Sequence, residues 1–307
     1  MVEERVEVAS DQPESAIAPH LSSPDLPVDV VRTPSDLAMV RGRSGDRRAI
    51  EQHLCETLRG QEHWALDGFC KICARAVAFQ GDWKHSNGQI ANFRERLVCP
   101  FCKLNNRQRF MAHLLTVMTR LEAPQAPIYF HEQVTRFFSW AQRALPSEVI
   151  GSEYLGPDVP SGANVRDVRH EDALALSFGD ASLGAIVSND VFEHVPDIDL
   201  CLAESARVLR AGGRLYFSIP FHDREETVQR AAVRDGEIVA LLPPQYHGNP
   251  IDPKGSLVFY EHGWDILERC RRAGFADAYA LGYWSLLYGH LGSGLQVAFV
   301  AEAPATP

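Results

Sequence analysis

Four cysteines in the N-terminal third of the chain have the spacing of a metal site. Cys70 and Cys73 form one C-x-x-C pair, Cys99 and Cys102 form a second, and 25 residues separate the pairs. Each C-x-x-C turn presents two thiolates to one side of an ion, so two turns supply the tetrahedral set that zinc prefers. Four thiolates leave no position for water, and such a zinc would be structural. A redox C-x-x-C or scattered buried thiols are the alternatives, and the matched pairs favour zinc.

The stretch between the two cysteine pairs has the composition of a small β-hairpin. It contains Trp83, the turn-like Asn87-Gly88, Ile90 and Phe93. Asn-Gly between apolar residues is typical of a tight hairpin turn. The two cysteine turns and this hairpin would together form a zinc-ribbon-like module.

Basic residues are concentrated around the cysteine pairs. Eight basic and three acidic residues lie between Trp64 and His113, so this segment carries +5 in a chain whose net charge is -10. The second pair is followed by a polar run that consists of Asn105, Asn106, Arg107, Gln108 and Arg109. A cationic edge of this kind could receive an anionic substrate or RNA. The alternative, that its arginines bind carboxylates of the acidic remainder, is favoured because no aromatic residues alternate with the basic ones.

Polar residues also follow a buried-strand pattern in the C-terminal half. Ala185 to Ser188 reads as a short buried strand, and Asn189 and Asp190 fall at its carboxyl end. Open α/β sheets bind their ligands at this end of the strands.

The segment from Asp172 to Pro220 carries an ordered series of motifs. They are Asp172, Leu176 to Phe178, Asp180, Ala185 to Ser188, Glu193-His194-Val195 and Arg207 to Gly213. In this order the motifs resemble the corresponding region of class I S-adenosylmethionine-dependent methyltransferases that are type 11-like. The four-cysteine unit followed by N-N-R-Q-R resembles a subgroup with a zinc-ribbon-like module in front of that fold. The resemblance implies an α/β Rossmann-like methyltransferase sheet of seven strands, with helices on both faces and a reversed last strand.

The resemblance also implies where S-adenosylmethionine would bind. Ile128 to Phe130 leads into His131 and Glu132 without the usual glycine-rich loop. The zinc-ribbon subgroup tends to carry a glutamate in a glycine-poor loop here, and Glu132 could meet the ammonium group of the cofactor. Alternatively, His131 and Glu132 merely cap the helix that begins near Val134.

Other cofactor contacts are expected at the following strand ends. Glu153 follows a strand at 149–152, some 23 residues after Phe130. A carboxylate at this spacing can accept hydrogen bonds from both ribose hydroxyls, although it could also be an ordinary exposed charge. By resemblance, Asp172 would lie beside the adenine amino group with Ala173 against the ring. Asn189 and Asp190 would close the pocket.

Methyl transfer is an in-line displacement that needs positioning and, for a hydroxyl or amine acceptor, one base. The candidate bases are His194, Asp190 and His222, and His194 could instead be a structural hydrogen-bonding group. The acceptor candidates lie in a long connection between the fifth and sixth strands, and they are Tyr246, His247 and Asn249. The sequence Gly-Asn-Pro at 248–250 could equally be turn chemistry.

Periodicity predicts the elements that position these residues. Helices are expected over 46–60, after Phe110, from Asp197 to the stop at Gly212-Gly213, and over 264–270. Strands are expected at 128–130, 149–152, 185–188, 215–219 and 295–301. We expect a disordered acidic, Pro-rich tail over 1–45, a helix with the zinc-ribbon-like module over 46–123, and the methyltransferase domain over 124–307.

Composition limits the classes of function. No apolar run reaches 18 residues, and Glu3, Glu4 and Glu7 lie where a signal peptide would carry basic residues, so neither a membrane span nor secretion is expected. Seven cysteines are too few for a disulfide scaffold, and Cys55, Cys201 and Cys270 fit small core positions, which indicates the cytoplasm. The leading hypothesis is a methyltransferase with S-adenosylmethionine and structural zinc that acts on a small polar or sugar-like acceptor. The alternatives are a non-catalytic binding protein of the same fold and a zinc-ribbon-guided RNA methyltransferase.

Overall fold

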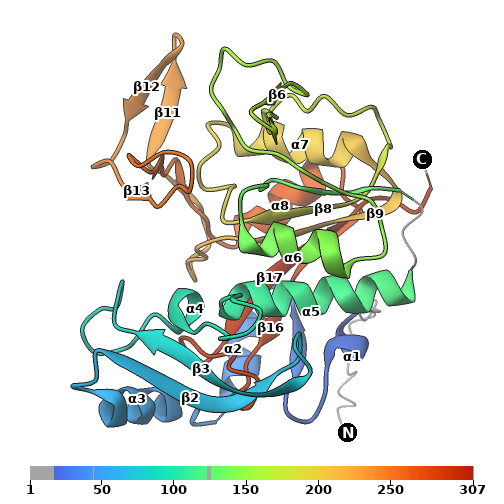
Figure 1. Cartoon of the computed structure of the whole chain (residues 1–307). Helices are drawn as coiled ribbons and strands as arrows, with labels where there is room; N and C mark the ends of the chain where they lie inside the picture. The colour runs from blue at the N-terminus through green and yellow to red at the C-terminus, as the bar shows by residue number, and fades with distance from the viewer. Residues whose placement is uncertain (1–16, 44, 123–125, 307) are drawn as a thin grey trace, which may run out of the picture.

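A seven-stranded sheet forms the centre of the computed structural model, which describes residues 17–43, 45–122 and 126–306 (Figure 1). The strand order is β1-β16-β17-β9-β8-β4-β5. The bounds are Val28–Val31 (β1), Asp277–Tyr283 (β16), Gln296–Glu302 (β17), Leu209–Ser218 (β9), Leu183–Asn189 (β8), Ile128–Phe130 (β4) and Val149–Gly151 (β5). Strands β5, β4, β8 and β9 are parallel, whereas β17 pairs antiparallel with both β9 and β16. The α/β sheet with a reversed last strand, which the resemblance implied, is confirmed.

Helices cover both faces of this sheet. Helices α1, α5 and α6 share one hydrophobic cluster with the sheet, and α2, α7 and α8 share the other. Their bounds are Ala18–Leu21 (α1), Asn106–Leu121 (α5), Arg136–Ala144 (α6), Pro34–Arg43 (α2), Ile198–Val208 (α7) and Asp265–Arg272 (α8). Since strand side chains alternate in direction, Tyr129 of β4 joins one cluster while Ile128 and Phe130 join the other.

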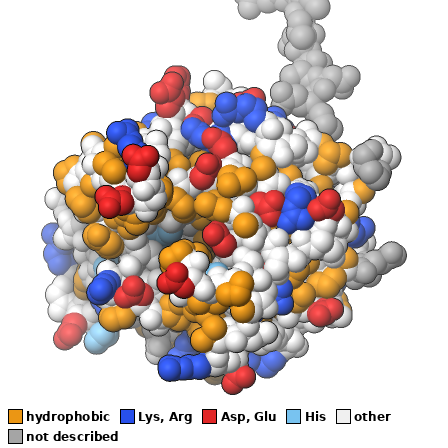
Figure 2. All heavy atoms as spheres, turned by 90° about the horizontal axis from the view of Figure 1, so that it is seen from above, with side chains coloured by type: hydrophobic (Ala, Val, Ile, Leu, Met, Phe, Trp, Pro, Cys, Tyr) orange, Lys and Arg blue, Asp and Glu red, His pale blue; other side chains and the backbone are white. Residues whose placement is uncertain are grey.

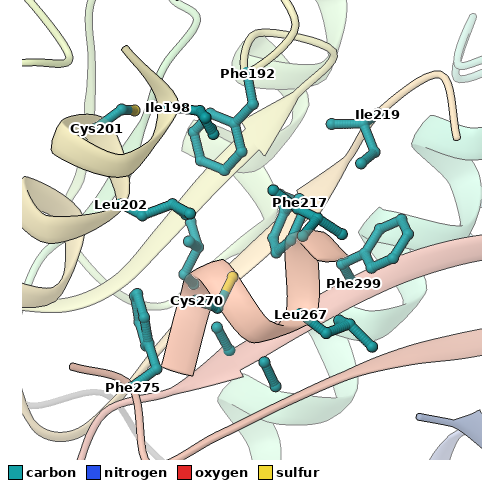
Figure 3. Packing of buried hydrophobic residues seen from close by; sticks show 14 of the residues in the cluster. Phe192, Ile198, Cys201, Leu202, Phe217, Ile219, Leu267, Cys270, Phe275 and Phe299 are labelled. Atoms are coloured by element: carbon teal, nitrogen blue, oxygen red, sulfur yellow. The ribbon is translucent and has the colours of Figure 1, made fainter. Parts of the chain in front are cut away.

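The cluster beneath α7 and α8 is built from interleaved aromatic and aliphatic side chains (Figure 3). Phe217 of β9 stacks on Phe299 of β17 with ring centroids 5.0 Å apart, and Phe192 lies 5.3 Å from Phe217. Cys201 and Cys270 are fully buried here, as is Cys55 in the cluster of the cysteine module, which confirms the predicted core positions. All seven cysteines are free of disulfide bonds.

The N-terminal segment is more ordered than its composition predicts. Residues 1–16 lie outside the described residues, but 18–43 form α1, β1 and α2. Strand β1 pairs with β16 at the edge of the sheet, and Leu21, Leu26 and Val31 are fully buried. The predicted disordered tail over 1–45 is therefore wrong for this part, because the β-branched residues of β1 pair with a distant strand and Val31 is buried.

The cysteine module is built around one hairpin, whose strands are β2 (His63–Cys70) and β3 (Arg75–Asp82). The Cys70–Cys73 turn connects these strands, so the hairpin lies around the first cysteine pair rather than between the pairs. The predicted hairpin at Asn87-Gly88 is wrong, because Asn87 Oδ1 there accepts hydrogen bonds from the backbone of Gln89 and Ile90 in a local turn. Two helices complete the module, and they are Arg47–Leu58 (α3) and Phe93–Arg96 (α4).

Short two-stranded ribbons lie between the sheet strands. They are β6 (Asn164–Val165) with β7 (Val168–Arg169), β10 (Val228–Gln229) with β15 (Tyr260–Glu261), β11 (Ala231–Arg234) with β12 (Glu237–Ala240), and β13 (Tyr246–His247) with β14 (Ser256–Leu257). The β11–β12 hairpin projects from the body at the upper left of Figure 1.

The other predicted helices and strands are present, and one of them ends at a different residue. Helix α7 ends at Val208, and Gly212-Gly213 lies inside β9 rather than stopping the helix. Within the described ranges, no helix has both the length and the apolar character needed to cross a membrane.

Candidate active site

A cleft of about 1890 Å³ opens at the carboxyl ends of β4, β5 and β8. The chain leaves β4 towards β5 on one side and returns to β8 on the other, which is the switch point where open sheets bind ligands. Figure 2 views the molecule from above and shows a hollowed surface flanked by hydrophobic side chains. The volume exceeds the roughly 300–1,000 Å³ of a typical small-molecule pocket, which leaves room for two ligands.

Glu132 and Asn189 meet at the floor of the cleft. Glu132 follows β4, Asn189 ends β8, and the Asn189 amide Nδ2 donates a hydrogen bond of 2.7 Å to Glu132 Oε1. Both side chains are buried, and burial raises the pKa of Glu132. A cation at this position would stabilise the ionised carboxylate, since a buried carboxylate is costly without a partner.

Glu153 fixes the glycine-free loop after β4. Its Oε1 accepts hydrogen bonds from the backbone N–H groups of Gln133 at 2.8 Å and Val134 at 2.9 Å. Helix α6 then begins after Thr135, whose side chain accepts from Phe138 N. One carboxylate oxygen thus stabilises a loop that lacks glycine, and Oε2 has no hydrogen-bond partner within the described part of the chain.

His131 is held neutral beside this loop. It is 8% exposed and packs edge-on against Tyr129 and Phe192, with centroids 5.0 and 5.8 Å away. Burial lowers its pKa to about 4, and neither ring nitrogen has a hydrogen-bond partner among the residues described. A neutral imidazole whose two nitrogens lack hydrogen-bond partners can donate one hydrogen bond to a ligand in the cleft and accept another from it.

Asp172 and Ala173 form another wall of the cleft. Asp172 Oδ1 accepts a hydrogen bond from Leu174 N at 2.9 Å, and the Asp172 N–H donates to Ser161 Oγ. Both residues are half-buried, so the carboxylate and the Ala173 methyl are accessible from the cleft.

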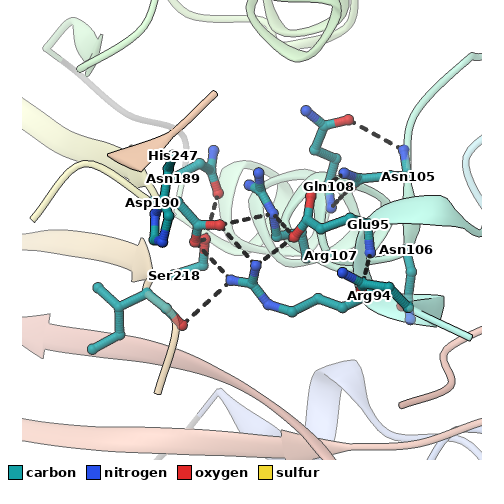
Figure 4. A network of polar contacts seen from close by, with 12 residues as sticks. Arg94, Glu95, Asn105, Asn106, Arg107, Gln108, Asn189, Asp190, Ser218 and His247 are labelled. Carbon is teal, nitrogen blue, oxygen red and sulfur yellow. Dashed lines mark hydrogen bonds and ion pairs between the residues drawn. The ribbon is translucent and has the colours of Figure 1, made fainter. Parts of the chain in front are cut away.

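Asp190 is bound by Arg94 of the cysteine module and by Arg107 at the start of α5 (Figure 4). Arg94 of α4 binds it through two bonds of 2.6 and 2.7 Å, and Arg107 Nε lies 3.2 Å from Oδ2. Burial alone would raise the pKa of Asp190, but the charges of Arg107 and Arg94 outweigh it and hold the pKa well below its usual range. Asp190 is thus an ionised anchor between the module and the sheet. Of the two interpretations of the basic segment, the one in which its arginines bind carboxylates is supported.

The predicted acceptor and base residues are only partly brought together. His194 and His247 lie beside each other with ring centroids 5.1 Å apart, and each has a nitrogen within 3.5 Å of Glu193 Oε1. His222 and the exposed Tyr246 also line the cleft. Asn249 also lines the cleft, and its Oδ1 accepts from Ile251 N and Asp252 N in a turn.

The four module cysteines form one cluster. Cys70 Sγ lies 3.9 Å from Cys102 Sγ, and Cys73 Sγ lies 3.8 Å from Cys99 Sγ. Sulfur atoms about 2.3 Å from one zinc ion at tetrahedral angles are about 3.8 Å apart, so the set fits zinc. Close by, Arg109 is buried, donates to the Leu97, Leu104 and Gly289 carbonyls, and lies over the Phe79 ring.

Two residues of the site were not predicted from the sequence. The sequence places Glu193 only within the E-H-V motif, yet its buried carboxylate lies within ion-pair distance of two predicted histidines. Arg94 could be assigned only to a basic segment, because its partner Asp190 lies 96 residues later in the sequence.

Comparisons with known proteins match the segment that forms this cleft. Residues 136–217 match the family model described as a methyltransferase domain. A 54-residue segment is 46% identical to an arsenite methyltransferase of Aquipseudomonas alcaligenes, over 18% of this chain and 16% of that protein. The chain thus matches only about a sixth of the curated relative.

Solved methyltransferase structures show weaker overall similarity. An S-adenosylmethionine-dependent methyltransferase from Mesorhizobium loti is 16% identical with a TM-score of 0.37, over 58% of this chain and 90% of that one. The 1,6-didemethyltoxoflavin-N1-methyltransferase of Burkholderia thailandensis is 16% identical with a TM-score of 0.35, over 61% and 75%. At these scores neither structure bears on the function of this chain.

Proposed function

We propose that this chain, in which residues 136–217 match the model of a methyltransferase domain, transfers a methyl group from S-adenosylmethionine to a small polar or sugar-like acceptor. The observation that carries the proposal is the position of Glu153. Its carboxylate lies at the carboxyl end of β5, inside the matched segment and at the switch-point cleft, and one of its oxygens accepts no hydrogen bond from the described residues.

The chemistry of the cleft fits the functional groups of the donor. Glu132 offers a buried carboxylate for the ammonium group, Glu153 Oε2 an acceptor for the ribose hydroxyls, and Asp172 an acceptor for the adenine amino group. The two ring nitrogens of His131, which have no partner among the described residues, add one hydrogen-bond donor and one acceptor at the same wall. When bound, S-adenosylmethionine would supply a methyl group made electrophilic by the sulfonium.

Glu153 holds the glycine-free loop after β4 in a fixed position. A glycine loop lets backbone N–H groups approach the cofactor, whereas here two N–H groups of the loop are bound by Glu153 Oε1. The loop is therefore positioned before any ligand binds, which reduces the entropic cost of cofactor binding.

The acceptor side is formed by Glu193, His194, Tyr246 and His247 together with His222. In-line transfer requires the nucleophile to face the methyl group and to lose its proton. Asp190 is poorly suited to act as the base, because Arg94 and Arg107 bind its carboxylate oxygens and lower its affinity for a proton. Deprotonation of the acceptor is instead assigned to the cluster around Glu193.

The cysteine module would bind structural zinc rather than guide RNA. Arg94, Arg96 and Arg107 form ion pairs with carboxylates, and Arg109 is buried. These side chains are therefore unavailable for the phosphate contacts that drive RNA binding. Their contacts weigh against RNA guidance by these four arginines.

Titration calorimetry with S-adenosylmethionine tests the proposal without knowledge of the acceptor. We expect saturable one-to-one binding, weakened about 10- to 100-fold by Glu153→Gln, since hydrogen bonds to charged groups contribute about 1.5–3 kcal/mol. Gln is preferred to Ala because its amide oxygen can still accept from Gln133 N and Val134 N. Glu148→Gln, an exposed glutamate next to the opposite end of β5, is the matched control.

Absence of binding by the folded wild-type protein would contradict the donor site. Equal affinities of the Glu153→Gln and Glu148→Gln variants for S-adenosylmethionine would show that Glu153 is not part of the donor site.

A further inference from the structure

We propose that Glu193, His194 and His247 bind a divalent transition-metal ion at the acceptor end of the cleft, in a site separate from the four cysteines. These residues come from two distant segments, the turn after β8 and strand β13. One carboxylate oxygen and one nitrogen from each imidazole all lie within 4.8 Å of one another.

The distances match a shared ion. Glu193 Oε1 lies 3.5 Å from His194 Nε2 and 3.4 Å from His247 Nδ1. Oxygen and nitrogen ligands about 2.1 Å from one ion at tetrahedral angles are about 3.4 Å apart. Both are ion-pair distances longer than a typical hydrogen bond, so the three groups face one another across a shared space.

The Glu193 carboxylate is buried without a hydrogen-bond partner. Its side chain is 1% exposed, and within the described ranges neither oxygen accepts a hydrogen bond. A buried carboxylate in this state is costly, and a cation between it and the imidazoles would remove the cost. The backbone is rigid at this point, because the Glu193 carbonyl accepts from Phe259 N and Tyr260 N.

His194 is oriented as a ligand. Its Nδ1 lies 2.8 Å from the Leu257 carbonyl oxygen, which can only accept, so Nδ1 carries the proton. In the neutral imidazole, Nε2 therefore directs a lone pair towards the Glu193 carboxylate. A proton on the outer nitrogen bound to a carbonyl is the usual arrangement of metal-binding histidines.

His247 completes the set from a half-buried hairpin. Its Nδ1 faces Glu193, and its outer Nε2 lies 3.4 Å from the exposed Gln245 amide, which can present its oxygen after rotation. Figure 4 shows His247 beside Asn189 and Asp190 at the carboxyl end of β8.

Two imidazoles and one carboxylate select a borderline metal such as Zn²⁺, Co²⁺ or Fe²⁺ over Mg²⁺ or Ca²⁺. Three protein ligands leave at least one coordination position, and all three residues line the cleft. An oxygen or nitrogen atom of the acceptor bound at that position would lose its proton more readily, and water in the open cleft would accept it. This use of the ion rests on the proposed function, whereas the metal site itself does not.

Metal analysis of the full-length protein tests the site. After equilibration with Zn²⁺ and desalting, we expect about two zinc ions per chain in the wild type, one of them on the cysteines. His247→Gln and Glu193→Gln should each lose one equivalent. With Co²⁺, the thiolate-to-cobalt absorption should persist in both variants, since the cysteine site is intact.

His85→Gln, which replaces an exposed histidine of the same cleft, is the matched control and should retain both ions. His247 lies on a short ribbon, so its variant reports on the site even if Glu193→Gln fails to fold. One zinc per wild-type chain, or two in His247→Gln, would overturn the proposal. These outcomes require neither donor nor acceptor, so they are distinguishable from failure of the methyltransferase proposal.

Discussion

Replacing Asp190 by asparagine should destabilise the protein by separating the cysteine module from the sheet. Asn preserves the shape of the side chain but removes the charge that Arg94 and Arg107 share. The Asp190 side chain is 16% exposed, and those of Arg94 and Arg107 are 22% and 15% exposed, so the arginines would retain poorly solvated charges.

The expected loss of unfolding free energy is about 2–3 kcal/mol. Removing one partner of a buried ion pair costs about 3–5 kcal/mol. The cost is smaller here because Glu95 also pairs with both arginines, at 2.7 Å from Arg107 Nε, and because the residues are partly exposed.

Urea unfolding monitored by tryptophan fluorescence and circular dichroism measures this loss. Asp180→Asn is the matched control, because Asp180 pairs with Arg207 at 2.7 Å but is 80% exposed, and Arg207 retains Glu204. The control should lose less than about 1 kcal/mol. A loss for Asp190→Asn no larger than that of the control would refute the proposed anchor.

Two further predictions concern metal and pH. Cys99→Ser should lower the zinc content and destabilise the cysteine module, because three thiolates no longer close the site; metal analysis with unchanged zinc would remove Cys99 from the ligands. Burial lowers the pKa of the fully buried His262 to about 4, so its protonation favours the unfolded chain, and its contribution to stability is lost as the pH falls from about 6.5 to 4. His262→Asn should therefore reduce the acid-induced loss of unfolding free energy by up to about 3 kcal/mol relative to the exposed-residue control His53→Gln, and equal pH dependence of the two variants would contradict this.

Elements with strong local patterns could be predicted from the sequence. The apolar run predicted as a strand at 185–188 lies within β8, and Asp197 caps α7 by accepting from Leu200 N. The N-terminus of α5 is also stabilised by residues close in sequence, because the side chains of Asn105 and Gln108 each accept a hydrogen bond from the other's backbone N–H.

Features that depend on distant partners could not be predicted. Strand β1 has only four residues, three of them valine, and lies among prolines and acidic residues, so the partner some 250 positions later that makes it a sheet strand could not be seen from the surrounding sequence. The same applies to Glu51, a buried carboxylate on α3 that accepts from Trp284 Nε1, Gly292 N and Gly294 N. Local periodicity does not encode pairings of this kind.

A crystal structure of the protein with S-adenosylhomocysteine would test the central claim most directly. The account predicts the ligand at the carboxyl ends of β4, β5 and β8, with its ribose hydroxyls on Glu153 Oε2 and its ammonium group near Glu132. A ligand bound elsewhere, or a cleft without density in crystals soaked at saturating concentration, would contradict it.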